Sequence, residues 1–292
     1  MIQSTLFYCA NKDTYPPFKN GLYKEEYFLK TFIENNPKTK RKYIPALWTN
    51  FQIEAWFQSR KDNMQKILDD WILNNPCKNG YFTIAQYDDN CLLKLPKNTI
   101  IYGSCSGSVP IPLIYQDINN TLENIPKIKF NDKTILCSFV GNITSNHIQP
   151  NVRKLMFDKL SNKKNFHLIN SGGWNPVVNK NNQDVFINTT INSVFALAPR
   201  GYGRSSFRFF EIFKLGSIPI YVWNDIDWLP FKDEIDYNKL CINIHYSQLH
   251  ELENILLNID EVKYYSMFNY YNTIKHLFSV EGLYEKIIRL ES

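Results

Sequence analysis

The sequence has 292 residues, of which 44% are hydrophobic and 15% aromatic, enough apolar material for one large or two ordinary domains. This composition excludes a disordered or fibrous chain. The formal net charge of +5 is spread along the chain, and its densest run, Lys38 to Lys42, lacks a neighbouring nucleic-acid-binding motif, which favours a solvated turn over a nucleic-acid contact.

The first half of the chain alternates short apolar runs with helical patterns. Strand patterns cover residues 4–10, 81–89, 98–104 and 111–115, and residues 42–48 are extended. Helical spacing covers residues 22–36 and 63–76, each ended by a proline. Strands separated by helices predict a parallel sheet in an α/β fold.

A polar, Asn-rich stretch at residues 116–133 is the candidate linker, and a second α/β pattern follows it. Strand patterns cover residues 134–141, 166–170, 194–199, 217–222 and 239–244, and helical patterns cover residues 150–162, 183–193 and 205–216. Residues 247–290 are helical by period. We therefore predict domains at residues 1–125 and 126–265, with residues 266–292 forming a helix that packs back toward the first domain.

The six cysteines are scattered and have neither CxxC pairing nor metal-ligand spacing to the five histidines. This pattern indicates reduced, mostly buried thiols in a reducing compartment. The first residues lack the basic and apolar regions of a signal peptide, and no run approaches the about 18 apolar residues that a membrane span needs. We therefore expect a cytoplasmic protein without a membrane span.

The most informative stretch is FALAPRGYGRSSFRFFEIF, which begins at Phe195. Gly201 and Gly203 allow a sharp turn and close approach of the backbone to a ligand, and Ser205 or Ser206 can cap the following helix. Gly216 is placed to end that helix. Because the start of a helix offers free N–H groups and a positive dipole end, this junction predicts an anion site.

Charged side chains surround this predicted helix start. Arg200, Arg204 and Arg208 can donate forked hydrogen bonds to phosphate oxygens, and the Glu211 carboxylate can accept both hydrogen bonds of a ribose diol. An Arg208–Glu211 salt bridge within the helix, with the glycines as turn residues, is the alternative interpretation. As a dinucleotide fingerprint the loop is incomplete, because Ser206 stands where a third glycine is required.

Residues 195–244 closely resemble the exostosin-like glycosyltransferases, glycosyltransferase family 47. The family's ordered signature is found here at Pro199, Gly201, Ser206, Arg208, Glu211, Gly216, Ile218, Pro219, Leu229, Pro230, Phe231, Ile235, Asp236 and Tyr237. Upstream, a strand ending at Gly141 and a helix carrying Arg153 also look like the family. The similarity covers about the second half of the chain, and the first half matches more weakly.

The resemblance implies a GT-B fold of two facing Rossmann-like domains, with the nucleotide sugar on the C-terminal domain and a glycan acceptor on the N-terminal one. It also implies inverting transfer, usually from a UDP-sugar, without an obligatory metal. UDP-xylose, UDP-galactose, UDP-glucuronic acid and an arabinose donor are all compatible. The donor-binding residues would be Gly141, Arg153, Arg200, Gly201, Tyr202, Gly203, Ser205, Ser206, Arg208 and Glu211.

Within this set, the resemblance implies that Glu211 holds the ribose and that Arg208 and the loop from Gly201 to Ser206 hold the diphosphate. Arg153 would be a second phosphate contact. Many relatives have a membrane anchor and stem that this sequence lacks, which favours a stand-alone enzyme such as bacteria or large viruses would use.

Inverting transfer needs a base for the acceptor hydroxyl, and we expect it in the N-terminal half. Asp88 and Asp89 follow a strand-like run and are the preferred candidates, although paired aspartates also form simple turns. Glu54 and His147 are further candidates, each with a solvated surface role as the alternative.

Other residues near the predicted donor site have mostly structural alternatives. Trp174 could stack on a base or a sugar, but a packed loop aromatic is the commoner use, and Tyr202 has the better position. Asp225 and Asp236 lie in the family signature, where turns that fix the donor loop are equally compatible. A catalytically silent nucleotide- or carbohydrate-binding module is the alternative function, and a dinucleotide-dependent oxidoreductase is a third.

Overall fold

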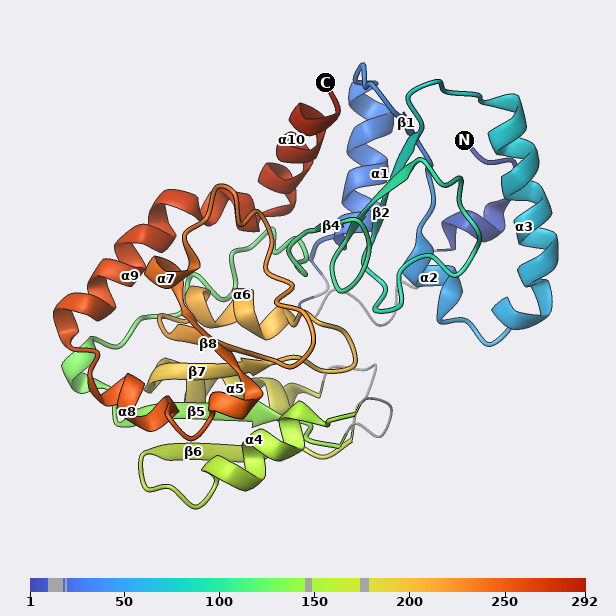
Figure 1. Ribbon diagram of the computed structural model, residues 1–292. Helices are drawn as coiled ribbons and strands as arrows, with labels where there is room; N and C mark the ends of the chain where they lie inside the picture. Colours follow the sequence, from blue (N-terminus) through green and yellow to red (C-terminus); the bar gives the residue numbers. More distant parts are fainter. Residues whose placement is uncertain (10–17, 19, 145–148, 174–178) are drawn as a thin grey trace. The chain divides into compact units, whose positions relative to one another are not determined.

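The computed structural model describes residues 1–9, 18, 20–144, 149–173 and 179–292 (Figure 1). The chain divides into two compact units: the first comprises Met1–Asp117 and His276–Ser292, and the second comprises Ile118–Lys275. The domain limits expected after residues 125 and 265 stay predictions. Among the described residues, every helix is too short or too polar to cross a membrane.

The first unit contains a sheet of four parallel strands in the order β1-β2-β3-β4. Their bounds are Lys42–Tyr43, Tyr81–Ala85, Thr99–Gly103 and Val109–Pro110. Every residue of β2 is buried, which is typical of an inner strand of a parallel sheet covered on both faces. As the sequence pattern indicates, no helix lies among residues 86–98 between β2 and β3.

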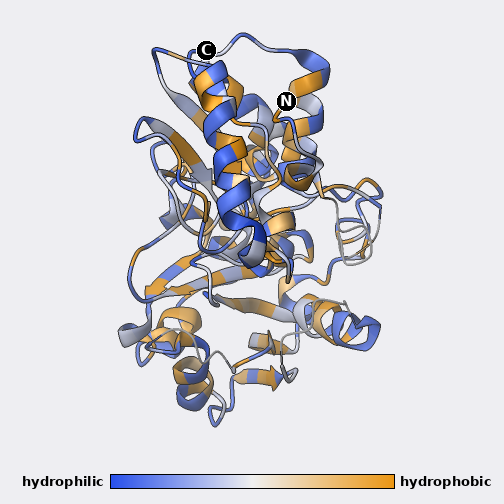
Figure 2. Cartoon of the chain, turned by 90° about the vertical axis from the view of Figure 1, so that its right-hand side faces the viewer, coloured by the Kyte–Doolittle hydropathy of each residue, from blue (hydrophilic) through white to orange (hydrophobic). Residues whose placement is uncertain are grey.

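Helices cover both faces of this sheet, and Figure 1 shows α1 (Lys24–Asn35) and α3 (Phe57–Asn74) on either side of β1 and β2. Side chains alternate between the two faces of the sheet along a strand. On one face, Phe82 of β2 packs against Phe28 of α1, and Phe28 also contacts Tyr284 of α10 (Val280–Glu291). Figure 2 shows both hydrophobic and hydrophilic residues along α10, as expected for a helix with one buried face.

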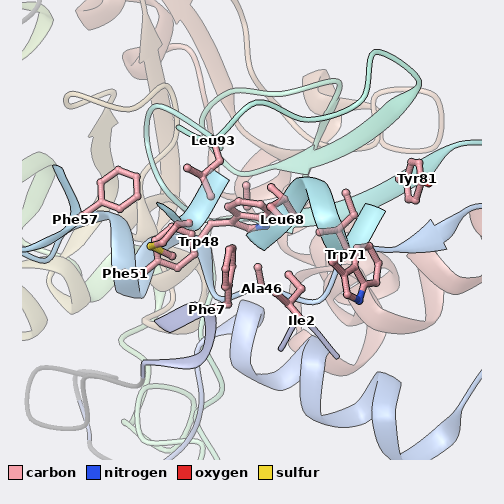
Figure 3. Close-up of a cluster of buried hydrophobic side chains, with 13 residues drawn as sticks. Ile2, Phe7, Ala46, Trp48, Phe51, Phe57, Leu68, Trp71, Tyr81 and Leu93 are labelled. Carbon is pink, nitrogen blue, oxygen red and sulfur yellow. The ribbon is translucent and has the colours of Figure 1, made fainter. Parts of the chain in front are cut away.

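The opposite face of β2 belongs to an apolar cluster with α3 and the preceding segments (Figure 3). Trp48, Phe51 and Leu68 are fully buried in it, and it also includes Tyr81 and Ala85 of β2. Trp48 and Phe51 lie in the short helix α2 (Trp48–Gln52). The Trp48 indole donates a 2.7 Å hydrogen bond to Thr83 Oγ1, so its polar group is satisfied inside the core.

Two predicted strands of the first half are wrong, and the extended run 42–48 contains only a short strand. Residues 4–10 include the 3-10 helix η1 (Thr5–Tyr8), because Ser4 accepts a hydrogen bond from Leu6 N–H and caps it. Residues 111–115 make only an isolated bridge between Tyr115 and Tyr23, and Pro112 lacks the N–H group that a ladder needs. The extended run 42–48 has only two ladder residues before Pro45 interrupts it.

The second unit contains five parallel strands in the order β6-β5-β7-β8-β9. They span, in chain order from β5, Ile135–Gly141, Phe166–Asn170, Ser193–Pro199, Ile218–Trp223 and Ile242–His245. Numbered within the unit this order is 2-1-3-4-5, a doubly wound arrangement whose direction reverses between β5 and β7. The prediction of an α/β fold with parallel sheets is confirmed.

Helices connect these strands and complete the unit. The α-helices are α4 (Val152–Leu160), α5 (Lys180–Ile191), α6 (Phe207–Lys214), α7 (Tyr237–Leu240), α8 (Leu252–Leu257) and α9 (Glu261–Ile274). Two short 3-10 helices are η2 (Phe130–Asp132) and η3 (Tyr246–Gln248). A further 3-10 helix, η4 (Lys275–Phe278), leads to α10. The predicted helical tail is thus confirmed as several shorter helices. Helix α9 packs on α6 through the stacked rings of Tyr271 and Phe213, whose centroids are 4.3 Å apart.

Candidate functional site

Helix α6 begins and ends where the sequence predicts. Ser206 is its N-cap, and the Ser206 Oγ accepts a hydrogen bond from Arg208 N–H at 3.3 Å. After Lys214 the chain turns through Gly216, whose φ of +77° favours glycine. The buried face of α6 carries Phe209, Phe210, Ile212 and Phe213, which leaves Arg208 and Glu211 only partly buried.

The side chain of Arg208, in α6, packs against the neighbouring helix α5. Its guanidinium carbon is 3.5 Å from the ring centroid of Phe186, within the range of a cation–π contact. A guanidinium stacked on a ring keeps its N–H groups directed outward in its own plane. Phe186 thus supports a cation in the first turn of α6.

Arg153 joins the two strands at which the direction of the sheet reverses. Its Nη1 donates to the carbonyl oxygen of Asn142, after β5, and its Nε donates to the carbonyl oxygen of Arg200, after β7, both at 3.2 Å. Arg153 lies in the first turn of α4, which Asn151 caps. In doubly wound sheets, ligands bind at this point outside the carboxyl ends of the strands.

Gly141 and Gly201 lie at the same edge of the sheet. A Cβ atom at position 141 would be 2.9 Å from the ring of Phe139, and one at 201 would be 2.8 Å from Nη2 of Arg153. A side chain at either position would therefore displace its neighbour. Gly203 is buried, and the Tyr202 side chain between the two loop glycines is 40% exposed.

Arg200 and Arg204 have a different environment from the one that sequence reasoning gave them. Arg200 is only 6% exposed, and its Nη1 donates to Asp225 Oδ1 at 2.6 Å and to Asn224 Oδ1 at 2.8 Å. Arg204 Nε donates to Asp225 Oδ2 at 2.9 Å. The Asp225 carboxylate, just after β8, thus binds both cations of the glycine loop.

Asp225 is held in its ionised form. Burial raises its pKa, but hydrogen bonds from Arg204 and from Ile226 N–H, together with the charge of Arg200, outweigh burial and lower the pKa to about 2. Asp225 therefore holds the glycine loop through Arg200 and Arg204. Asp236 has a structural place as well, because it caps α7 by accepting from Asn238 N–H.

The candidate bases of the first unit lie in two places. Asp88 and Asp89 follow β2 in a turn, where the Ser106 hydroxyl donates to the Asp88 carbonyl oxygen at 2.8 Å. Burial and the charges of Asp89 and Asp88 raise the pKa of the adjacent Tyr87. Glu54 lies in the turn between α2 and α3. His147 and Trp174 lie outside the described residues.

Sequence reasoning missed two buried charged residues in the first turn of α1. Lys24 and Glu25 are each 1% exposed. The Glu25 carboxylate accepts hydrogen bonds from Thr49 N–H at 2.9 Å, from Thr49 Oγ1 at 2.8 Å and from Gln86 N–H at 2.5 Å. The spacing of residues 22–36 indicates a helix but carries no signal that these two side chains are buried.

Nowhere among the described residues do three or more His, Cys, Asp or Glu side chains cluster as metal ligands would. All six cysteines are free thiols, and Cys105, Cys137 and Cys241 are buried.

The Exostosin GT47 domain model matches residues 97–259, which is more than half of the chain. The match includes α4 with Arg153, the glycine loop and α6 with Arg208 and Glu211. A comparison with curated proteins finds no match.

Proposed function

The chain belongs to the exostosin GT47 family and carries a glycosyltransferase domain, and we propose that it transfers a sugar from a UDP-sugar to a glycan hydroxyl with inversion at the sugar carbon. The UDP donor and the stereochemistry are inferred from the resemblance to this family. The GT-B arrangement of two Rossmann-like domains is part of the same proposal.

The observation that carries the donor site is the position of Arg153 across the ends of β5 and β7. Two hydrogen bonds from Arg153 go to backbone carbonyl oxygens, which hold its guanidinium at the switch point. The first turns of α4 and α6 begin at the same edge of the sheet, and helix starts attract anions. Together these features suit a diphosphate.

Each donor contact follows from this placement. Arg153, Arg208 and the N–H groups from Gly201 to Ser206 would bind the diphosphate, with Ser205 beside the cap and Gly141 leaving room at the end of β5. The Glu211 carboxylate, one turn along α6 from Arg208, would accept hydrogen bonds from the ribose diol. Tyr202 is exposed at the tip of the loop and would lie beside the donor. Arg200 and Arg204 would act through Asp225 by keeping the loop in shape.

In the proposed reaction, the acceptor hydroxyl oxygen forms a bond to the anomeric carbon while the bond from that carbon to the diphosphate oxygen breaks. The electron pair leaves with UDP, whose growing negative charge is stabilised by Arg153, Arg208 and the helix starts. Because these positive groups already meet the diphosphate, the proposal includes transfer without an obligatory metal ion. Asp88 or Asp89 would take the proton from the acceptor hydroxyl.

The test is a panel of UDP-sugars incubated with the protein and mixed glycan acceptors, with free UDP and transferred sugar as readouts. Calorimetry with UDP, GDP and NAD runs in parallel. We expect UDP to bind and at least one UDP-sugar to be consumed. Binding of UDP without turnover of any donor would instead indicate a silent binding module, and tight NAD binding without UDP binding would indicate an oxidoreductase.

A further inference from the structure

The first turn of α1 contains two adjacent ionisable side chains that are both buried, Lys24 and Glu25. Helix α1 otherwise packs through apolar residues such as Phe28 and Leu29. A charged pair is expensive to bury, and a well-packed apolar pair of similar volume often gives equal or greater stability. Stability alone therefore does not account for these two residues.

Glu25 connects segments that follow two different strands. Thr49 is in α2, a few residues beyond β1, and Gln86 directly follows β2. The Glu25 carboxylate accepts hydrogen bonds from both backbone N–H groups, at 2.9 Å from Thr49 and at 2.5 Å from Gln86. Its two oxygens therefore fix the backbone of both segments. A carboxylate suits this position because it has two acceptor oxygens and no donor of its own.

Lys24 makes a similar contact to a third segment. Its Nζ donates to the carbonyl oxygen of Pro112 at 2.5 Å, two residues beyond β4. The side chains of one dipeptide thus reach the segments that follow β1, β2 and β4. All of these segments lie at the carboxyl edge of the first sheet.

Further buried polar groups lie at this edge. Gln86 and Ser104 follow the paired strands β2 and β3, and within the described part of the chain Gln86 Oε1 and Ser104 Oγ are buried without a hydrogen-bond partner. Unmatched buried polar atoms are rare and call for water, an ion or a functional reason. The carboxyl edge of the first sheet therefore contains several buried polar groups.

We propose that Glu25 is a positioning residue of the transfer reaction: by holding Gln86 N–H it fixes the turn from Tyr87 to Asp89, which carries the proposed base. This inference rests on the proposed function. Gln86 is the last residue before that turn, and Asn90 N–H closes the turn by donating to the Tyr87 carbonyl oxygen at 3.0 Å. A shift of the Gln86 amide would therefore move both aspartates.

The test compares Glu25→Gln with Glu26→Gln. A glutamine has one acceptor oxygen in place of two, so it leaves the N–H group of either Thr49 or Gln86 facing an NH₂ group. Glu26 is the matched control: it lies in the same turn of α1 and bonds Asn50 and Tyr23 N–H but makes no hydrogen bond to Gln86. Hydrogen exchange, kcat, donor KM and UDP affinity are measured for both.

We expect Glu25→Gln to speed amide exchange over residues 86–90 and to lower kcat about ten-fold or more, with donor KM and UDP affinity unchanged. Glu26→Gln should leave all four unchanged. If Glu25→Gln fails to fold because Lys24 loses its counter-charge, the double variant Lys24→Met/Glu25→Gln removes both charges and takes its place.

Two results would overturn the inference. Unchanged exchange over residues 86–90 would show that Glu25 does not hold this turn, whether or not the protein transfers a sugar. Faster exchange with an unchanged kcat would show that the turn does not take part in the reaction. Absence of UDP binding and of transfer in the unaltered protein would overturn the proposed function instead, while exchange would still report on the role of Glu25 in the turn.

Discussion

Arg153 and Gly201 lie so close that a Cβ atom at position 201 would be 2.8 Å from Nη2 and 3.2 Å from Cζ of Arg153. The absence of a side chain at 201 lets the guanidinium reach the carbonyl oxygens after β5 and β7. The glycine of the loop thus has a second use besides the turn, since it makes room for a cation from another helix.

Gly201→Ala should therefore displace Arg153 while leaving the fold intact. The atoms that it meets are the flexible end of a side chain, so we expect little change in melting temperature but about ten-fold weaker UDP binding, or about 1.4 kcal/mol. Calorimetry and a thermal melt measure the two effects. Gly173→Ala is the control, because a Cβ there meets no atom of the described residues within 4 Å. Equal UDP affinity in both variants would remove Arg153 from the donor site.

Arg208→Lys tests whether the charge alone is sufficient at the start of α6. Lysine keeps the charge but loses the planar guanidinium that stacks on Phe186 and pairs with phosphate oxygens. We expect UDP affinity to fall about ten-fold in Arg208→Lys and further in Arg208→Ala.

Glu211→Ala should weaken UDP binding but leave pyrophosphate binding unchanged. Lys214→Ala, at the far end of α6, is the control.

Asp225→Asn tests the structural role of the carboxylate behind the loop. Arg200 would remain 6% exposed with its counter-charge removed, so we expect a loss of about 1 kcal/mol in unfolding free energy, a small value because the Asp225 side chain is 39% exposed. The pKa of Asp225 is lowered from 3.8 to about 2, so its contribution is full above pH 3.8 and is lost as the pH falls through about 2. Denaturation at stepped pH measures this, and a constant difference between the two proteins down to pH 2 would contradict it.

The parts of the site that the sequence predicts correctly have local signals. Ser206 caps α6, Gly216 ends it, and the apolar runs on either side form β7 and β8, because each depends on neighbouring residues. The contacts of Arg200 and Arg204 depend instead on Asp225, which is 25 and 21 residues away along the chain. No spacing rule connects them, so the sequence suggested a phosphate as their partner.

Contacts between residues that are far apart along the chain also explain what sequence reasoning missed or predicted wrongly in the first half. Glu25 accepts hydrogen bonds from Thr49 and Gln86, which are 24 and 61 residues away, and a helical period gives no sign of this. Residues 111–115 have a strand-like composition, but a ladder also requires a paired partner strand and backbone N–H groups. Pro112 has no backbone N–H group. The α/β class was predictable because it depends on many local patterns together.

Asp88→Asn and Asp89→Asn test the base. If either carboxylate accepts the acceptor proton, its variant should lower kcat about 100-fold or more and leave UDP affinity unchanged. Asp70→Asn, on the exposed side of α3, controls for the loss of one negative charge. Full activity in both Asp88→Asn and Asp89→Asn would remove the assignment and direct attention to Glu54 and His147.

The Lys24–Glu25 pair should make the stability of the protein depend on pH in a distinctive way. Burial raises the pKa of Glu25 from 4.5 to about 7, against hydrogen bonds from Gln86 and Thr49 and the charge of Lys24, which lower it. Burial also lowers the pKa of Lys24 from 10.5 to about 7, although the nearby Cys105 and Glu25 raise it.

The two shifts act in opposite directions on stability. Between pH 4.5 and 7 the unfolded chain has released the Glu25 proton that the folded chain still holds, so stability falls as the pH rises. Between pH 7 and 10.5 the folded chain lacks the Lys24 proton that the unfolded chain keeps, so stability rises with pH. Burial raises the pKa of two neighbours, Cys91 and Tyr43, which therefore stay neutral across the lower window. The contribution of the pair should be least favourable near pH 7.

The double variant Lys24→Met/Glu25→Gln lacks this dependence and isolates it. Urea denaturation of both proteins at about pH 5, 7 and 9 should show the variant equal to or more stable than the unaltered protein at pH 7 and relatively less stable at pH 5 and 9. A difference that stays constant across the three conditions would show that neither group changes its protonation on folding. A variant that is as stable at pH 7 but slower in transfer would separate the reactive role of the pair from its effect on the fold.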